Sequence, residues 1–518
     1  MAGTVQTGWE QPRSEPAALR PRQVWLPYVH ALIGCLILSW FVVYNGWPVF
    51  YEDTSGYLTR PGRVLGSLGL ATEWNPLAPG LVGDPTGVPE ATSGNFRSAK
   101  DNPVWMGGRS VYYGTLMVLI SALATTYAIA LVQAYLTALA IAIPWFRLGG
   151  KPVSYLALLA LLSLVTGVAV VASALIPDIF FAVAVLACAT LLVLWRELTL
   201  LDRWVLTLLL CFSALSHQSI LALLLLISAA SGLAMLVRAG RAAYLRFTPI
   251  WFASVVGVCG LLAFALLAQI VSGRPPLNLP HLAARTATTA AGKAVLEERC
   301  PEIKLAVCDY RSQIARGDWI TFMFSKDTTT GVFGPAPLST KYRLSQEQFS
   351  LVLLVAKERP LAFAQAEAQD MIRELASFTL IDFDVSKKRG LVAIVSPDML
   401  ARIQATRSFR DGGRVLSALS DLTYVSTVVG LVCILVYFAF KQDRLVLTQS
   451  EIFAFLLLVG VLINALICGA LAGVYDRFQA RVIWLVPLAA AFIILNNTRR
   501  YGSKDQAHTG DEHSGGLS

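Results

Sequence analysis

The sequence predicts an all-helical polytopic membrane protein, and three observations carry this prediction. The chain has 518 residues, of which 55% are hydrophobic and only 14% are charged, whereas soluble proteins have about 25% charged residues. Apolar runs long enough to cross a membrane recur along the chain. Lys and Arg residues gather in alternate connections between these runs, so the net charge of +9 reports orientation in a membrane and predicts no nucleic-acid partner.

About ten segments have the composition of membrane spans, which need roughly 17–25 mostly apolar residues. They are 25–45, 127–146, 153–175, 179–195, 203–216, 219–237, 248–271, 424–440, 450–473 and 482–496. The fifth is short and is consistent with a tilted or re-entrant helix. The first has a basic lead-in but no small-residue cleavage site, which predicts a retained helix rather than a signal peptide.

The distribution of Lys and Arg sets the direction of the spans. Basic residues occupy the connections around 13–22, 147–151, 196–203, 238–246, 441–444 and 499–504. The opposite short turns have none around Asp178 or His217, and have two near the end, Arg477 and Arg481. Because basic loops stay on the cytoplasmic side, we expect both termini in the cytoplasm and a multi-pass protein of a bacterial inner membrane.

This topology divides the chain into five parts. We expect a cytoplasmic tail at 1–24, seven spans within 25–271 that include an outer loop at 46–126, an extracytoplasmic region at 272–423, three spans within 424–498, and a disordered cytoplasmic tail at 499–518. The end of the outer loop, "GGRSVYYGTLMVLISAL", is apolar but precedes another full span. It therefore predicts a helix lying along the membrane surface.

The outer region at 272–423 is predicted to be mainly helical. Its stretch "LSQEQFSLVLLVAKERPLAFAQAEAQDMIRELASF" indicates two helices separated at Pro360. Cys300 and Cys308 both fall in this region. Because an extracytoplasmic compartment is oxidising, we expect them to form a disulfide; two unpaired thiols are the alternative.

Polar residues that could carry chemistry occur in five separate outer connections. The first is "PVFYEDTSGYL", which places Glu52 and Asp53 just beyond the first span. The complete set is Glu52, Asp53, Tyr57, Arg109, Tyr112, Tyr113, Asp178, His217, Gln218, Asp476, Arg477 and Arg481. The predicted topology brings all of them to one face of the membrane.

Each of these residues also has a purely structural interpretation. Asp53 and Asp178 sit where they could cap helices, His217 could be a hydrogen-bonded turn residue, and the tyrosines match an interfacial aromatic belt. Arg477 and Arg481 are harder to explain in this way, because the charge bias disfavours them on the outer side. Taken together, the residues indicate a polar cavity lined by carboxylates and arginines.

Carboxylates and arginines at a lipid interface suit one type of reaction. A carboxylate can accept a proton from an acceptor hydroxyl or amine, or can hold a divalent cation, and arginines bind phosphate oxygens bidentately. A lipid-linked phosphate must be met at the interface. The pattern therefore indicates glycosyl transfer from a polyprenyl-phosphate sugar. The chain has no G-x-x-x-x-G-K-[ST] motif for ATP.

At these positions the chain resembles the GT-C superfamily of membrane glycosyltransferases, which includes lipid-phosphate-sugar mannosyltransferases and the aminoarabinose transferases of lipid A. The resemblance rests on "YEDTSGYL", "GRSVYYGTL", "PDIFFAVAVL" and "YDRFQARVIWLVPL", and its layout covers about 1–271 and 424–498. His217 stands where many members have lysine. The same motifs are similar to a group of uncharacterised bacterial membrane proteins, so no particular sugar is implied.

The resemblance implies a GT-C-like fold and a role for each residue. Asp53 is the expected catalytic base or metal ligand, with Glu52 and Asp178 as further carboxylates, and Arg477, Arg481 and Arg109 are expected to bind the donor phosphate. Substrate contacts fall to Tyr57, Tyr112, Tyr113, His217, Gln218 and Asp476. The partners implied are a polyprenyl-phosphate-linked sugar, the bilayer, and a glycan, lipid or protein acceptor; no cofactor is required, although a divalent cation at Asp53 is an option.

Two other functions compete with this interpretation. A transporter or flippase would show internal repeats, broken helices and polar groups near the middle of the membrane. The predicted spans look continuous, and their few polar residues include His30, Gln133 and Asn464. A non-catalytic assembly factor for envelope polysaccharide would use 272–423 as a docking module. Loss of function on Asp53→Asn would favour the transferase over the assembly factor.

Overall fold

The structure of the chain is a computed structural model that describes residues 21–67, 69, 104–238, 241–386, 397–441 and 446–495. Within these ranges the regular structure is helical. Two isolated β-bridges pair Val49 with Ala174 and Met106 with Leu277. The predicted tail at 499–518 and the middle of the first outer loop lie outside the described residues. An all-helical protein is what the composition predicted.

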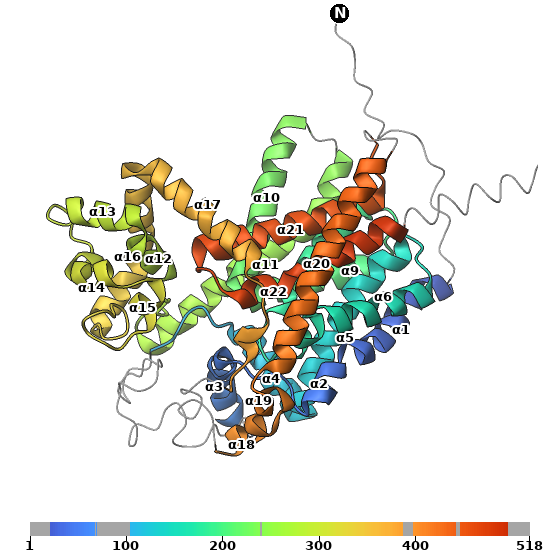
Figure 1. The fold of residues 1–518 in the computed structure, drawn as a ribbon, viewed down its shortest axis with the longest axis horizontal. Coiled ribbons are helices and arrows are strands. Elements are labelled where there is room, and N and C mark those ends of the chain that lie inside the picture. Colours follow the sequence, from blue (N-terminus) through green and yellow to red (C-terminus); the bar gives the residue numbers. More distant parts are fainter. Residues whose placement is uncertain are drawn as a thin grey trace, which may run out of the picture.

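Most helices pack into one bundle (Figure 1). Within it, α8 (Ile179–Val193) is apolar on every side and almost entirely buried. A helix without a polar face must bury its whole circumference, and α8 does so against its neighbours. The other bundle helices are α1 (Pro21–Leu38), α2 (Trp40–Asn45), α5 (Thr126–Arg147), α6 (Pro152–Val165), α7 (Val168–Ser173), α9 (Leu200–Ser216), α10 (Gln218–Arg238), α11 (Arg241–Ser272), α20 (Arg414–Phe440), α21 (Gln449–Leu471) and α22 (Asp476–Ile483), which continues as a helix over 485–495.

Seven helices in the described part are long and apolar enough to cross a membrane, and each coincides with a predicted span. They are Gln23–Asn45, Thr126–Arg147, Gln218–Met235, Tyr244–Ser272, Arg414–Phe440, Gln449–Leu471 and Asp476–Leu495. The chain is therefore a membrane-embedded helical protein.

The other three predicted spans form helices shorter than the seven membrane-length helices. The segments 179–195 and 203–216 correspond to α8 and α9, of 15 and 17 residues. The segment 153–175 was expected to be continuous but is broken between α6 and α7 at Thr166 and Gly167. A Cβ at Gly167 would lie 2.7 Å from the Leu380 side chain, so a residue distant in sequence packs into the break. The structure supports seven spans, and ten stays a prediction.

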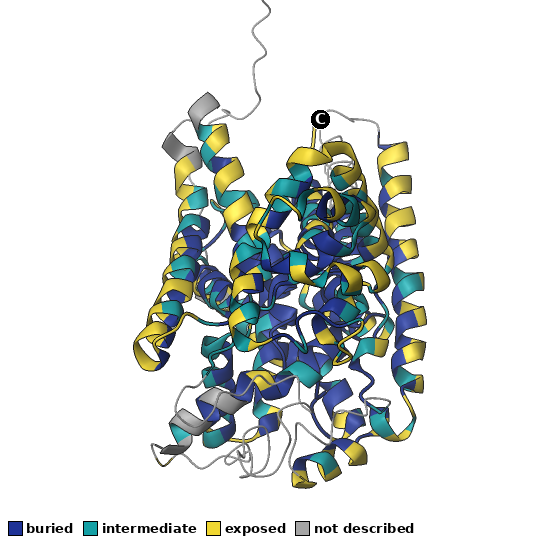
Figure 2. Ribbon diagram, turned by 90° about the vertical axis from the view of Figure 1, so that its left-hand side faces the viewer, coloured by how far each residue is buried: buried dark blue, intermediate teal, exposed yellow. Residues whose placement is uncertain are grey.

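The burial of the long helices shows which of them face lipid. The apolar windows of Gln218–Met235 and Arg414–Phe440 are only 28% buried, whereas those of Thr126–Arg147 and Asp476–Leu495 are 78% buried. The first pair therefore presents apolar surface outward, and the second pair forms the interior. Figure 2 shows this contrast as exposed outer faces on the flanking helices around a buried centre.

A separate helical lobe lies beside the bundle and covers part of the region 272–423 that was predicted to lie outside (Figure 1). The end of that region differs from the prediction, because 414–423 already belong to the membrane-length helix Arg414–Phe440. The lobe contains α12 (His281–Thr288), α13 (Ala290–Arg299), η1 (Ala306–Tyr310), α14 (Arg311–Arg316), α15 (Trp319–Phe324), α16 (Leu338–Glu358) and α17 (Pro360–Ala376). The break predicted at Pro360 is confirmed, since α17 begins there. The structure joins Cys300 and Cys308 in a disulfide, with Cα atoms 5.4 Å apart.

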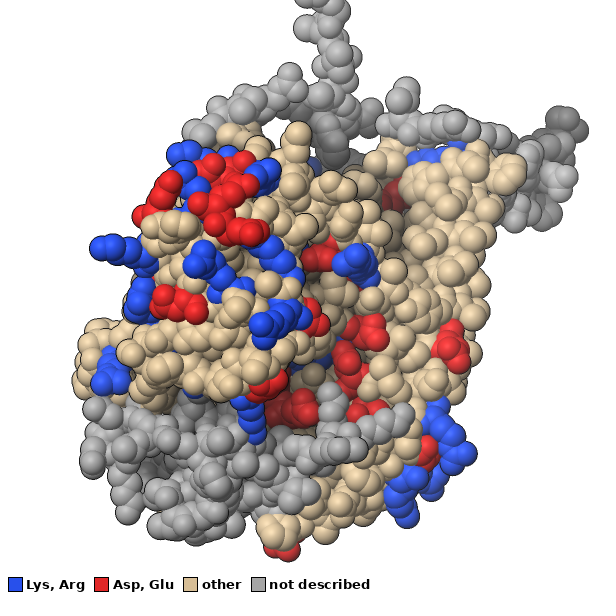
Figure 3. All heavy atoms as spheres, turned by 60° about the vertical axis from the view of Figure 1, so that its left-hand side comes forward, with Lys and Arg blue, Asp and Glu red and all other residues tan. Residues whose placement is uncertain are grey.

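The lobe returns to the bundle through α17, which packs along α21. Beyond it lie η2 (Ile381–Phe383), α18 (Pro397–Ala405) and α19 (Arg407–Arg410). Figure 3 shows charged side chains of both signs gathered on the surface of this lobe, while much of the visible flank of the bundle is uncharged. This difference agrees with a water-exposed lobe attached to a lipid-exposed bundle.

Candidate functional site

Five charged side chains from distant parts of the chain meet at one end of the bundle. They belong to α3 (Glu52–Ser67), the connection before α4 (Val111–Leu123), the start of α8, and α22. We call this group the charged site. Its members are Asp53, Arg109, Asp178, Arg477 and Arg481.

Backbone pairing between two connections places Asp53. The Val49 N–H donates to the Ser173 carbonyl, and the Leu175 N–H donates to the Val49 carbonyl, both over 2.9 Å. The Thr54 hydroxyl adds a 3.1 Å hydrogen bond to the Leu175 carbonyl. Since α3 begins at once after this pairing, its first turn holds Asp53 beside the start of α8.

A second short pairing places Arg109. The Gly107 N–H donates to the Leu277 carbonyl over 2.8 Å, which fixes the chain just before α4. The Arg109 side chain then crosses α3 at Gly56, where a Cβ would lie 2.5 Å from the arginine Cδ. Any larger residue at position 56 would collide with it. Arg109 Nη2 reaches and donates to Asp53 Oδ1.

Arg477 links the two carboxylates. Its Nη2 donates to Asp53 Oδ2 over 2.9 Å, and its Nη1 lies 3.9 Å from Asp178 Oδ2. The guanidinium stacks over the Tyr51 ring, with 4.2 Å between the guanidinium carbon and the ring centroid. The side chain is 11% exposed, so it lies at the edge of the site and not on the surface.

Arg481 lies one turn further along α22 and is fully buried. Its Nη1 is 3.5 Å from Asp178 Oδ1. Its Nε and Nη2 donate to Asn464 Oδ1 over 3.1 and 2.8 Å, and Nη2 also lies 3.0 Å from Ser219 Oγ. A buried guanidinium is tolerated only when it is paired and hydrogen-bonded, and α21 supplies most of these partners.

Asp53 and Asp178 do not act as helix caps. Asp178 stands at the N-cap of α8 but makes no capping hydrogen bond, so the capping interpretation is wrong for it. Asp53 lies inside the first turn of α3 and directs both oxygens at arginines. Burial opposes its ionisation, but the Arg109 and Arg477 guanidiniums outweigh burial and hold the pKa of Asp53 well below 3.8.

The site leaves hydrogen-bonding capacity unused. Arg477 Nε, Arg481 Nη1 and Asp178 Oδ2 are buried and have no hydrogen-bond partner. Buried polar atoms are normally paired, and each exception needs an explanation. Arg481 Nη1 and Asp178 Oδ2 keep longer ion-pair contacts, at 3.5 and 3.9 Å, but none of the three atoms has a hydrogen bond. A ligand that offers both donors and acceptors could supply these bonds.

The predicted tyrosines divide between the site and its support. Tyr57 lies close enough to be affected by the charged site: burial and the Asp53 charge raise its pKa, although Arg109 opposes this. Tyr113 is buried behind it, with its hydroxyl donating to Gln133 Oε1 over 2.8 Å. Tyr112 donates to the Gly260 carbonyl on α11 instead. This hydrogen bond joins α4 to α11, and the role of Tyr112 in substrate binding stays a prediction.

The three other predicted residues, His217, Gln218 and Asp476, differ in where their side chains lie. His217 lies near the charged site; its Nδ1 accepts from the Ser219 N–H, and burial, with the Arg481 and Arg477 charges, lowers its pKa to about 3. Gln218 is exposed, and it is the neighbouring Ser219 that contacts Arg481. Asp476 accepts from the Thr379 hydroxyl and so anchors the segment before η2.

Sequence reasoning missed several groups around the site. In the sequence they resemble ordinary polar residues of helices and turns, and no motif marks them. The buried Glu374 on α17 accepts from the Tyr475 N–H over 3.0 Å with Oε2, while its Oε1 has no hydrogen-bond partner. Burial raises the pKa of Glu374 to about 8. Asp382 accepts from the Arg477 backbone N–H over 3.1 Å. Burial, with the Arg109 charge, lowers the pKa of His281 to about 4.

The donor set does not favour a metal ion at Asp53. Both of its oxygens already accept from guanidiniums, so a divalent cation would have to displace an arginine. Across the described ranges, no cluster of three or more His, Cys, Asp or Glu side chains could hold a metal ion. Glu52 is the first residue of α3 and lies in the same helical turn as Asp53, so it supplies the second carboxylate there.

Comparison of the chain with family models, with curated proteins and with solved structures finds no match in any of the three. The fold and the charged site therefore define the chain as a helical membrane protein with a buried arginine–carboxylate site, and its function must be argued from that site.

Proposed function

We propose that the chain is a membrane glycosyltransferase that moves a sugar from a polyprenyl-phosphate donor to an envelope glycan, lipid or protein acceptor. One observation carries the proposal. Arg477 Nε and Arg481 Nη1 are unsatisfied donors beside Asp178 Oδ2, an unsatisfied acceptor. A sugar phosphate complements such a site, because phosphate oxygens accept hydrogen bonds and sugar hydroxyls donate them.

The position of the site supports a lipid-linked donor. Arg477 and Arg481 lie in the first turns of Asp476–Leu495, a helix long and apolar enough to cross a membrane. A phosphate bound to them would lie near the end of that helix, where a polyprenyl chain could extend along the apolar flank of the bundle. A water-soluble phosphate donor would not need its site at the membrane boundary.

The reaction follows from how a donor would change the ion pairs. Asp53 is a weak base while two guanidiniums hold it ionised. A donor phosphate that binds Arg477 competes for this arginine, which frees Asp53 Oδ2 and makes it more basic. The acceptor hydroxyl oxygen then bonds to the anomeric carbon, the bond from that carbon to the phosphate oxygen breaks, and the hydroxyl proton passes to Asp53. The lipid phosphate leaves as an anion stabilised by the arginines.

The direct test is lipid analysis and transfer activity of the purified full chain. We expect mass spectrometry of a lipid-retaining preparation to find a polyprenyl phosphate, and the Arg477→Ala variant to retain at least tenfold less. The control is Arg359→Ala, whose guanidinium is 46% exposed and pairs on the lobe surface. Equal lipid content in all three proteins, or no polyprenyl phosphate in the wild type, would contradict the proposal.

A transporter of lipid-linked sugars is the second candidate, because two observations favour it. The span expected at 153–175 is broken between α6 and α7, and the buried pair Arg481 and Asn464 lies within membrane-length helices. Broken helices and intramembrane charges are typical of transporters. Reconstituted vesicles separate the two functions: a transporter moves the labelled lipid between leaflets with its phosphate–sugar bond intact, whereas a transferase breaks that bond.

A further inference from the structure

A cavity of about 560 Å³ lies between the lobe and the bundle, apart from the charged site. Its walls come from α12, α13, the start of α15, the middle of α17, and Val474 in the turn before α22. Ligand sites in proteins usually have volumes of about 300–1,000 Å³, so the cavity is large enough for a small molecule or for the end of a longer chain.

The basic residues of this cavity are already neutralised or engaged. Arg285 donates to Asp370 Oδ2 from Nε and Nη2 over 3.0 and 2.8 Å, and to Glu367 from Nη1 over 2.7 Å. Arg373 pairs with the other Asp370 oxygen over 3.3 Å. Lys293 Nζ donates to the Ala315 and Gly317 carbonyls. Arg285, the buried cation of this cavity, is thus fully paired, whereas Lys293 and the 68% exposed Arg373 keep part of their charge at its edge.

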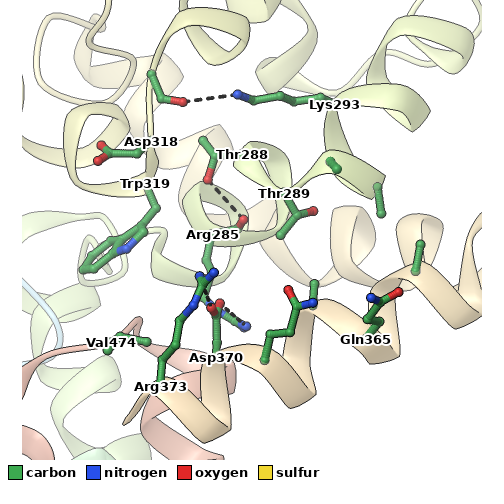
Figure 4. A pocket seen from close by; sticks show the side chains of 16 residues that line it. Arg285, Thr288, Thr289, Lys293, Asp318, Trp319, Gln365, Asp370, Arg373 and Val474 are labelled. Carbon is green, nitrogen blue, oxygen red and sulfur yellow. Dashed lines mark hydrogen bonds and ion pairs between the residues drawn. The ribbon is translucent and has the colours of Figure 1, made fainter. Parts of the chain in front are cut away.

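The groups left for a ligand are neutral amides, one carboxylate and one indole. Figure 4 shows Asp318 and Trp319 on one side of the cavity and Gln365 on the opposite side, with Arg285 between them. Gln369 lies one turn beyond Gln365 on the same face of α17, and both side chains are exposed. Asp318 is the N-cap of α15, where hydrogen bonds from Thr321 lower its pKa, so it is an ionised acceptor at neutral pH.

Such a set matches a sugar better than other small ligands. A saccharide has a rim of hydroxyls that both donate and accept, which amides and a carboxylate can satisfy together. It also has an apolar C–H face that packs on an aromatic ring, as an indole can provide. A peptide would offer no comparable ring of hydroxyls, and an anion would find the buried Arg285 already paired with two carboxylates.

The cavity adjoins the charged site through a thin wall. On α17, Asp370 and Arg373 line the cavity, while the next residue, Glu374, binds the Tyr475 N–H. The Trp319 ring packs edge-on against the Tyr475 ring, with 5.1 Å between centroids. Tyr475 is two residues before Arg477, so the cavity and the charged site lie on opposite sides of the same turn.

We propose that this cavity binds a neutral saccharide unit of the acceptor, with Trp319 as its stacking surface and Gln365, Gln369 and Asp318 as its hydrogen-bonding groups. The inference that the saccharide is the acceptor rests on the proposed transferase function, but the binding itself does not. A sugar held here approaches the charged site from the lobe, while a lipid-linked donor approaches it from the bilayer.

The test is a titration of the purified full chain with a panel of neutral trisaccharides, in which binding is measured by calorimetry or by ligand-observed NMR. The panel is maltotriose, cellotriose, mannotriose and chitotriose, with inorganic phosphate as an anionic probe. We expect at least one trisaccharide to bind, and the Gln365→Ala/Gln369→Ala double variant to bind it at least tenfold more weakly. Alanine preserves the helix, and both side chains are exposed, so this variant should fold.

Further variants sharpen the result. Trp319→Phe should weaken binding severalfold and Trp319→Ala should abolish it, whereas Trp204→Ala, which removes an indole that is 58% exposed on α9, should bind like the wild type. The proposal is overturned if no trisaccharide binds, if binding is unchanged in the double variant, or if phosphate binds in a Trp319-dependent way. Because polyprenyl-phosphate retention is measured separately with Arg477→Ala, this failure is distinguishable from failure of the transferase proposal.

Discussion

Arg477 Nη2 donates to Asp53 Oδ2 over 2.9 Å, so one ion pair joins residues 424 positions apart in the sequence. Asp53 follows the first membrane-length helix, and Arg477 begins the last one in the described part. The same arginine lies 3.9 Å from Asp178 at the start of the central α8. One side chain thus ties the beginning, the centre and the end of the bundle together, and substitutions at this pair should be the most informative.

Asp53→Asn should abolish function while the protein remains folded and inserted in the membrane. The amide retains the shape of the carboxylate but removes the charge that holds Arg109 and Arg477 and the base that would accept the proton. A general base contributes about 10²–10⁴-fold to rate, so we expect transfer activity, or complementation of a deletion strain, to fall at least 100-fold. Asp53→Glu is the charge-retaining control. Near-normal activity of Asp53→Asn would show that the carboxylate is only structural.

Arg477 and Arg481 should differ in what they do. Arg477 is partly accessible, so Arg477→Ala should weaken donor binding by about 10- to 100-fold, the equivalent of the roughly 1.5–3 kcal/mol of a charge-assisted hydrogen bond. Its melting temperature should also fall, because the variant removes the mostly buried ion pair between Arg477 and Asp53, so donor binding is compared on folded protein. A binding titration with a short-chain polyprenyl phosphate, run on the wild type and the variant, measures this. Arg477→Lys keeps the charge but loses the planar guanidinium, so its affinity for the donor should lie between those of the wild type and Arg477→Ala.

Arg481→Ala should destabilise the protein more strongly, in addition to weakening donor binding. Its removal leaves Asn464 and Asp178 without their buried partner, and breaking a buried ion pair costs about 3–5 kcal/mol. We expect a lower melting temperature in detergent and poor recovery from the membrane. If the Arg481→Ala protein is as stable as the wild type, then the structural role is wrong, whereas unchanged donor affinity would contradict its proposed role in binding the phosphate.

The sequence predicted much of the charged site because topology alone brings outer connections together. The alternation of basic loops assigned Asp53, Arg109, Asp178, Arg477 and Arg481 to one face, and the structure places them in contact. Which side of the membrane this face occupies stays a prediction. The lobe helices on either side of Pro360 were also predictable, because proline is favoured in the first turn of a helix and disfavours continuation of the helix before it; α5 and α11, which contain Pro144 and Pro249, show that the rule has exceptions in this chain.

What the sequence could not predict depends on packing between distant segments. Gln218 and Ser219 are adjacent and both polar, so only the register of α10 decides that Ser219 meets Arg481. Glu374 lies on an amphipathic helix, where an acid normally faces water; its burial comes from the packing of α17 on the bundle. The break at Gly167 depends on Leu380, more than 200 residues away.

The orientation of the lobe is testable by cysteine labelling. Ser350 lies on α16 and is exposed, so Ser350→Cys should react with a membrane-impermeant maleimide. We expect labelling in intact spheroplasts, because the Lys and Arg bias places 272–423 outside. The background should be a variant in which Cys259 and Cys433, the two exposed free cysteines, are replaced by alanine. Labelling only after lysis would reverse the predicted orientation of every span.

The disulfide between Cys300 and Cys308 should stabilise the lobe modestly. It closes a loop with a sequence separation of 8, and the loop-entropy model gives about 2–3 kcal/mol for a loop of this size. The Cys300→Ala/Cys308→Ala variant should therefore unfold at lower temperature than the wild type, as should the wild type under reducing conditions. Reductant should not change the melting temperature of the double variant. Mass spectrometry that finds both thiols alkylated without reduction would disprove the bridge.

Glu374 should make the stability of the protein depend on pH. Burial raises its pKa from 4.5 to about 8 in the folded protein, while in the unfolded chain the carboxyl ionises near its ordinary value. Between about pH 5 and 8 the folded protein therefore holds a proton that the unfolded chain releases. The contribution of Glu374 to stability must therefore fall as pH rises through this range, by up to about 1.4 kcal/mol per pH unit, and this fall should level off above pH 8. His217 and His281, whose pKa values are lowered in the folded protein, contribute in the opposite sense below about pH 6.5, so the Glu374 contribution is read from a comparison with a variant.

Glu374→Gln removes this titration while retaining an oxygen that can accept from the Tyr475 N–H. Melting temperatures of both proteins are measured from pH 5 to 9, and the difference between them should shift in favour of Glu374→Gln as pH rises toward 8. Glu302→Gln is the matched control, because Glu302 is 63% exposed on the same lobe, and its curve should run parallel to that of the wild type. If the Glu374→Gln curve is also parallel, then Glu374 is ionised in the folded protein, and a water or ion must satisfy its second oxygen.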